Sequence, residues 1–148
     1  MRKTILAAGA GILLGWAGCA SSPTVSDYLT PEQAVLQAAE AAPAGVPGTF
    51  VLVVAGASAA DGDDYLDSQK DYRDQRNLAV DVTPHAAAQL KQQYGKEPLA
   101  FFVGKRIAVA GTAYRAKIII RDNGKPTGLY YYQTHLRVVE AAQIRLLP

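Results

Sequence analysis

The chain has 148 residues, of which 49% are hydrophobic and 19% charged, and its formal net charge is +2. This length fits one domain, and a single cysteine excludes an internal disulfide framework and a cysteine-ligated zinc site. No apolar run in the sequence reaches the length of a membrane-spanning helix, which excludes a polytopic membrane protein, and the small net charge argues against a strongly basic nucleic-acid binder.

The first residues have the architecture of an export signal. A positive pair, Arg2 and Lys3, is followed by an apolar stretch at 5–16 and then by the only cysteine, Cys19. The apolar stretch is too short to span a bilayer stably and has the length of a signal-peptide core. Residues 1–18 are therefore predicted to be a signal peptide.

The motif WAGC at 16–19 resembles the signal of bacterial lipoproteins, in which the cysteine is lipidated and becomes the first mature residue. That family usually has Leu at the position where this chain has Trp16. The resemblance implies lipidation of Cys19 and attachment to a membrane. Because Ala20 stands where an inner-membrane protein of the family has Asp, it favours the periplasmic side of the outer membrane. The alternative is ordinary cleavage near Ala20, which leaves a soluble periplasmic or secreted protein.

A tether and a short helix are expected next. Residues 19–29 are mostly small and polar, as in flexible tethers. Thr30, Pro31 and Gln33 form the pattern of an N-cap with a capping box, which predicts a helix from Pro31 to Ala42. Prolines and glycines end this helix, so residues 30–47 are predicted to be helix and linker, and 48–148 the main domain.

The main domain is predicted to be mainly β. One helix, from Thr83-Pro84 to Tyr94, is expected before Gly95. Gly56 permits a sharp bend in the first strand, and Gly111 is expected at a bulge. Apolar runs and alternation predict the strands, which are 49–54, 65–66, 77–82, 105–114, 129–139 and a closing segment at 144–147. Residues 118–120 either extend the strand at 105–114 or begin a new one.

This order resembles the OB-fold, a five-stranded Greek-key barrel with a helix between its third and fourth strands. The segments that carry the resemblance are TFVLVVAG at 49–56, YLDS at 65–68, NLAVDVTP at 77–84, VGKRIAVAGTAY at 103–114 and THLRVVEAAQIRLL at 134–147. The expected fold is thus a small OB-fold-like barrel with one inserted helix, preceded by a short N-terminal helix. The resemblance implies a ligand on a strand face, and nucleic acid as a partner rests on this resemblance alone.

Alternation on the last long strand predicts a ligand-binding face. Tyr131, Gln133, His135 and Arg137 fall on one side of the strand, and Arg73 in the mixed-charge loop 70–76 is a further candidate. The alternative is an ordinary solvated outer face. The three consecutive tyrosines at 130–132 cannot form one stacking platform, because neighbours face opposite sides, and at least one of them is expected in the core.

No catalytic or metal-binding pattern is present in the sequence. The acidic segment 61–67 lacks the ligand spacing of a calcium-binding EF-hand loop. The sequence also contains no phosphate-binding loop, no HExxH motif and no Ser-His-Asp grouping. We therefore expect no metal, no cofactor and no enzymatic activity.

Charge is segregated along the chain. Residues 61–81 carry 7 acids and 3 bases, whereas residues 91–148 carry 10 bases and 3 acids. A basic face on the last strands would favour an anionic polymer, unless the acidic segment folds against it. The sequence predicts a lipid-anchored envelope protein that acts as a non-catalytic binding or interaction module. The alternatives are an envelope protein–protein scaffold and, less favoured, a phosphodiester hydrolase.

Overall fold

The computed structural model describes residues 28–148, so the predicted signal peptide, the lipidation site Cys19 and the tether up to residue 27 lie outside the described residues. None of the helices in this part of the chain is long and apolar enough to cross a bilayer. The elements in chain order are β1 (Tyr28–Leu29), α1 (Pro31–Ala41), β2 (Val46–Val53), β3 (Gly56–Ala60), β4 (Asp63–Asp67), β5 (Leu78–Val82), α2 (Pro84–Tyr94), α3 (Pro98–Phe102), β6 (Arg106–Asp122), β7 (Lys125–Val138), the 3-10 helix η2 (Ala141–Gln143) and β8 (Ile144–Leu146).

The strands form one mixed sheet with the order β1-β2-β6-β7-β5-β4-β3, and β8 pairs with β6. Most neighbours are antiparallel, but β1 with β2 and β5 with β7 are parallel. The mainly β class is therefore confirmed. The expected five-stranded barrel is not confirmed in that form, because the sheet has eight strands and is not closed.

The higher strand count arises partly from interruptions in continuous runs of chain. β2 and β3 are separated only by Val54 and Ala55, which bond to different neighbours. The Val54 amide donates to the carbonyl of Lys105 at 2.9 Å, and the Ala55 amide donates to the carbonyl of Asp67 at 2.8 Å. The chain therefore leaves β6 and joins β4 at this point, next to Gly56, where a bend was predicted. In the same way, η2 separates β7 from β8.

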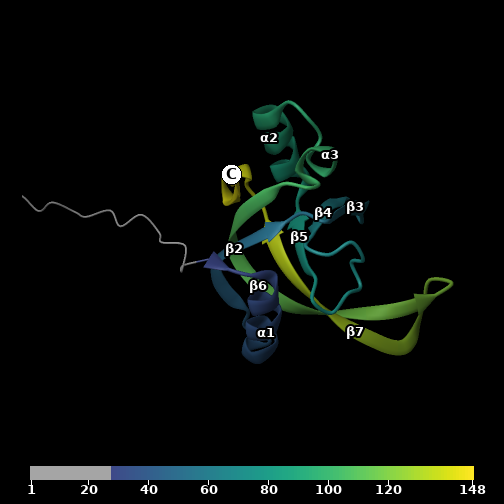
Figure 1. Ribbon diagram of the computed structural model, residues 1–148. Coiled ribbons are helices and arrows are strands. Elements are labelled where there is room, and N and C mark those ends of the chain that lie inside the picture. The colour runs from purple at the N-terminus through teal and green to yellow at the C-terminus, as the bar shows by residue number, and fades with distance from the viewer. Residues whose placement is uncertain (1–27) are drawn as a thin grey trace, which may run out of the picture.

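Helices cover both ends of the bent sheet, with α1 at one end and α2 and α3 at the other (Figure 1). The predicted capping box of α1 is confirmed. The backbone N–H of Gln33 donates to the Thr30 hydroxyl at 3.3 Å, and the backbone N–H of Thr30 donates to the side-chain oxygen of Gln33 at 2.9 Å. Ala34 is fully buried in the core, so α1 packs with the main domain. β2 begins at Val46, earlier than predicted, and so contains Pro47.

The core lies inside the bend of the sheet. Alternation in the segment 77–82 predicts one shared face for Leu78, Val80 and Val82, and in β5 all three are fully buried. The predicted helix α2 is also confirmed, and it ends at Gly95, which has the left-handed φ of 71° that glycine tolerates. The other large, fully buried side chains are Phe50, Val54, Leu66, Leu90, Phe102, Ile107, Val109, Leu136 and Val138.

Residues 118–120 extend β6, which continues to Asp122. The bulge expected at Gly111 is wrong: the irregularity lies between Ile119 and Arg121, whereas Gly111 pairs regularly with Gly48. Gly111 is required for space: a Cβ there would lie 2.8 Å from Cδ1 of Leu136.

The pairing of β6 with β7 extends well past the residues at which either strand pairs with any other strand. β2 pairs with β6 only as far as Ala113, and β5 pairs with β7 only from Thr134 onward. Residues 114–133 therefore form a two-stranded hairpin, here called the arm, which extends away from the rest of the sheet (Figure 1).

Candidate functional site

The predicted face of β7 exists, and it is the outer face of the sheet. Tyr131, Gln133 and His135 lie opposite Ile118, Ala116 and Tyr114 of β6, respectively. Directly opposed residues share a face of a sheet, so these side chains point away from the core. Leu136 and Val138, which alternate with His135 and Arg137 along the strand, are fully buried on the inner face.

A buried carboxylate–imidazole pair lies on this outer face. Nδ1 of His135 is 2.8 Å and 3.0 Å from the carboxylate oxygens of Asp81 on β5. The side chains of His135 and Asp81 are only 10% and 5% exposed, so His135 does not belong to a solvated surface. Nε2 of His135 lies 2.8 Å from Oε1 of Gln133. Because each ring nitrogen faces an oxygen atom, the imidazole is held in one orientation.

Tyrosines enclose this pair. The Tyr65 ring meets the imidazole edge-on at 6.3 Å between centroids, and the Tyr114 ring lies at 6.0 Å. Burial and then the negative charge of Asp81 raise the pKa of both phenols. Tyr65 and Tyr114 are therefore protonated at neutral pH and can serve as hydrogen-bond donors.

Gln133 links the Asp81–His135 pair to the loop 68–77. Its amide donates to the Tyr131 hydroxyl at 2.8 Å and, at 3.4 Å, to the backbone carbonyl of Tyr72 in that loop. Both ends of the Gln133 side-chain amide are therefore engaged: the oxygen faces the imidazole of His135, and the nitrogen donates to the Tyr131 hydroxyl.

A second buried carboxylate fixes the same loop. Asn77 donates to Asp67 at 2.7 Å, and its oxygen accepts from the Ser68 hydroxyl at 3.2 Å and from the Gln69 amide at 3.1 Å. Burial raises the pKa of Asp67, and the hydrogen bond from Asn77 opposes that shift. These contacts hold the loop beside the outer face of β4 and β5.

A groove of about 460 Å³ opens over these residues. It contains three of the predicted residues, together with aromatic and acidic side chains that sequence analysis missed. The groove is lined by Ser58, Ala59, Ala60, Asp61, Tyr65, Asp67, Tyr72, Ala79, Ile118, Tyr131, Gln133 and His135. A second hollow of about 550 Å³ shares Tyr72, Ile118 and Tyr131 with the groove, so the two lie next to each other.

The two predicted arginines lie apart from this groove. Arg137 is engaged with Asp63, with 2.8 Å between the guanidinium and the carboxylate. Arg73 lines the second hollow, where its Nε donates to the Tyr72 hydroxyl at 3.0 Å. Tyr131, Gln133 and His135 thus lie together in the groove. Arg73 lies in the neighbouring hollow beside Tyr131, and Arg137 lines neither.

The consecutive tyrosines differ from the prediction. Tyr130 and Tyr132 are 50% and 36% exposed, and Tyr131 is half-buried in the groove. None of the three is in the core, because all of them lie on the arm, where no second layer covers the strands.

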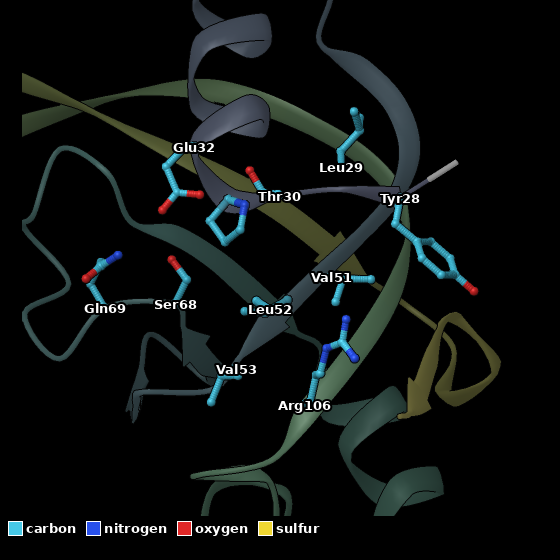
Figure 2. Close-up of a pocket in the computed structure, with 11 residues that line it drawn as sticks. Tyr28, Leu29, Thr30, Glu32, Val51, Leu52, Val53, Ser68, Gln69 and Arg106 are labelled. Carbon is cyan, nitrogen blue, oxygen red and sulfur yellow. The ribbon is translucent and has the colours of Figure 1, made fainter. Parts of the chain in front are cut away.

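A third pocket, of about 430 Å³, lies at the start of α1 (Figure 2). Glu32, Ser68 and Gln69 stand on one side of it and Arg106 on another, around the strand segment Val51–Val53. None of the residues predicted for ligand binding lines it. Within residues 28–148, no three His, Cys, Asp or Glu side chains are grouped as a metal site requires.

Asp81, Asp67, Tyr65 and Tyr72 are the site residues that sequence analysis missed. Alternation in NLAVDV does place Asp81 on the outer side of β5. Its partnership with His135 depends on the parallel pairing of β5 with β7, which no local pattern indicates. Comparison with protein-family models and with curated protein sequences gave no match for this chain.

Proposed function

We propose that the protein is an exported lipoprotein of the cell envelope, lipidated on Cys19, whose β domain is an OB-like module that binds a ligand without catalysis. The signal architecture at 1–19 supports export and lipidation. Labelled palmitate should enter the wild-type protein and be lost in Cys19→Ser. Equal labelling of both proteins would contradict lipidation at this residue, and no labelling of either would favour a soluble periplasmic or secreted protein.

The OB-like assignment is supported by the order of strand pairing. When β2 with β3 and β7 with β8 are taken as single interrupted runs, five runs remain besides β1, and α2 stands between the third and the fourth. The first run pairs with both the second and the fourth, which is what a barrel of this type needs.

The groove carries the proposal of ligand binding. OB-folds bind on the face of their second and third strands and with the loop between the first two. In this chain those elements are β4, β5 and the turn at Asp61, and all three contribute to the groove. Because the arm side of β7 forms the opposite wall, the groove crosses the sheet and can hold an extended ligand.

The lining favours a polyhydroxylated ligand such as a neutral oligosaccharide. Tyr65, Tyr72 and Tyr131 provide flat apolar surfaces with hydroxyl groups at their ends. The Ser58 hydroxyl, the phenol hydroxyls and the Asp61 carboxylate contribute donors and acceptors, which suit hydroxyls that both donate and accept. Asp61 and Asp67 would repel phosphates, so a polyanion or nucleic acid is the less favoured occupant of this groove.

Two neighbouring tyrosines provide a matched test. Tyr131 lies in the groove and Tyr130 points to the opposite face of the same strand. With chitotetraose and cellotetraose as probes in calorimetry, Tyr131→Ala should weaken binding by about tenfold or more, since a buried aromatic contact contributes about 0.5–1.5 kcal/mol beyond its area. Tyr130→Ala should have little effect. Equal loss in both variants, or binding of a single-stranded oligonucleotide and of neither sugar, would contradict the proposal.

A phosphodiester hydrolase is the second candidate, because a carboxylate–imidazole pair beside an open groove is an arrangement that general bases use. Turnover of bis-p-nitrophenyl phosphate that disappears in His135→Gln would favour it over a binding module. A protein–protein scaffold is the remaining alternative, and it would use the exposed arm and leave the groove empty.

A further inference from the structure

The arm presents a second functional surface on the face opposite the groove. Lys117 lies directly opposite Tyr132, and Ile119 lies opposite Tyr130, so these side chains share one face with Arg115, which is two residues before Lys117. We call these five residues the basic face of the arm.

Cations on the basic face rest on aromatic rings. The Arg115 guanidinium carbon lies 4.0 Å from the centroid of the Tyr132 ring, and Nζ of Lys117 lies 4.0 Å from that of Tyr130. The two rings pack edge-to-face with centroids 5.6 Å apart. Each charged group thus lies over the face of a ring, an attractive contact that orders it before any partner binds.

These cations lack acidic partners. Within residues 28–148, Arg76, Lys91 and Arg137 each form a salt bridge. Among the described residues, the basic side chains of the arm form none, and the arm holds one acid, Asp122. The unneutralised cations are Arg115, Lys117, Arg121 and Lys125. The basic face carries two of these cations, two exposed tyrosines and an Ile119 that is 41% exposed, which fits an anionic and partly apolar partner.

We propose that the basic face of the arm docks on a membrane surface through acidic phospholipid headgroups. Lysine and arginine attract anionic headgroups, tyrosine favours the interfacial region, and an isoleucine side chain can enter the acyl boundary. This choice of partner rests on the proposed lipid anchor. The nine residue-to-residue steps from Cys19 to Tyr28 can span at most about 30 Å, which keeps the domain close to the bilayer. Even weak docking then becomes effective, because the local concentration of lipid is high.

Docking would also orient the groove. β1, where the chain enters the domain, and the tip of the arm lie at opposite ends of the molecule (Figure 1). Attachment at both ends lays the domain along the membrane. Because Tyr131 and Gln133 occupy the other face of the arm, the groove then opens away from the bilayer. One hairpin would thus contact the membrane on one face and the groove ligand on the other.

Vesicle binding tests this proposal with the mature chain, residues 19–148, carrying Cys19→Ser, so that neither an acyl chain nor the apolar signal segment contributes. The vesicles contain phosphatidylcholine alone or with about 30% phosphatidylglycerol, which gives the negative surface potential that attracts basic residues. The test variant is Arg115→Gln with Lys117→Gln, and the matched control is Lys70→Gln with Lys96→Gln, two exposed lysines outside the arm. Partitioning is measured by co-sedimentation, and folding by far-UV circular dichroism.

The arm variant should bind acidic vesicles roughly 30-fold more weakly than the unsubstituted chain, from the usual contribution of each basic residue near such a surface. The control variant should lose much less, and neutral vesicles should not distinguish the proteins. Equal binding by arm and control variants would overturn the proposal, as would arm-dependent capture of soluble polyphosphate with no preference for acidic vesicles. If the arm variant does not fold, a salt titration of the unsubstituted chain decides: binding that does not weaken between about 0.05 and 0.5 M salt would overturn the proposal. Sugar binding in the groove is scored separately, so failure of docking and failure of the groove are distinguishable.

Discussion

Replacing Asp81 with Asn tests whether the buried Asp81–His135 pair ties β5 to β7. The substitution preserves size and one acceptor oxygen but removes the charge that faces the imidazole at 2.8 Å. Both side chains are almost completely shielded from water, so solvent cannot replace the lost interaction.

The expected cost follows from this burial. Removing one partner of a buried charged pair typically costs about 3–5 kcal/mol. Asn keeps one acceptor, so the expected loss here is about 3 kcal/mol. With a urea dependence of about 2 kcal/mol per molar for a domain of this size, the unfolding midpoint should fall by about 1.5 M. The control is Asp63→Asn, which breaks the Asp63–Arg137 pair, whose arginine side chain is 49% exposed. Such a pair should contribute less than about 1 kcal/mol.

The assay is urea unfolding of Asp81→Asn, His135→Gln and the double variant, followed by circular dichroism. If the two side chains stabilise the fold through each other, the double variant should lose less than the sum of the single losses, by about 1 kcal/mol or more. Additive losses, or an Asp81→Asn variant no less stable than Asp63→Asn, would refute the assignment of a coupled buried pair.

Three other predictions follow from the structure. Burial raises the pKa of Asp67 above 3.8, so the folded chain holds this proton to higher pH than the unfolded chain; its stabilising contribution is complete below pH 3.8 and is lost as pH rises through the folded pKa. The unfolding free energy should therefore decrease less steeply with pH in Asp67→Asn than in the unsubstituted chain, as measured by urea unfolding at a series of pH values. An unchanged pH dependence would contradict this. The hydrogen bonds from Arg76 lower the pKa of Asp74 to about 2, and Arg76→Gln should move that pKa back toward 3.8 in a carboxyl NMR titration; no movement would exclude Arg76 as the cause. Gly111→Ala should destabilise the fold by about 1–3 kcal/mol in urea unfolding, because its Cβ would meet the fully buried Leu136 at 2.8 Å; a neutral effect would mean that Leu136 can move.

Local patterns predicted the elements whose causes are local. The cap at Thr30, the end of α2 at Gly95 and the inward face of β5 depend on neighbouring residues, and the structure has all three. The shared face of Tyr131, Gln133 and His135 likewise follows from the two-residue period of a strand.

The errors concern features that depend on distant segments. A glycine inside a strand suggested a bulge at Gly111, but the position is small because Leu136 of the neighbouring strand packs against it. The apolar tyrosines at 130–132 suggested a core position, yet the strands there extend past their neighbours. His135 was predicted to face solvent unless it bound a ligand, and its burial depends on Asp81 and Tyr65 from other strands.

The pairing of distant strands has a consequence for how fast the domain folds. Phe50 must find Val109, and Val80 must find Leu136, before the sheet acquires its native order. Both searches close long loops, and the loop-closure entropy is lost before most of the core contacts form. Domains dominated by such non-local pairing fold in about milliseconds to seconds, whereas helical bundles of similar size fold in microseconds to milliseconds. The pairing of β2 with β6 and of β5 with β7 therefore makes this chain a slow folder, and its strand edges are exposed to other chains until these pairs form.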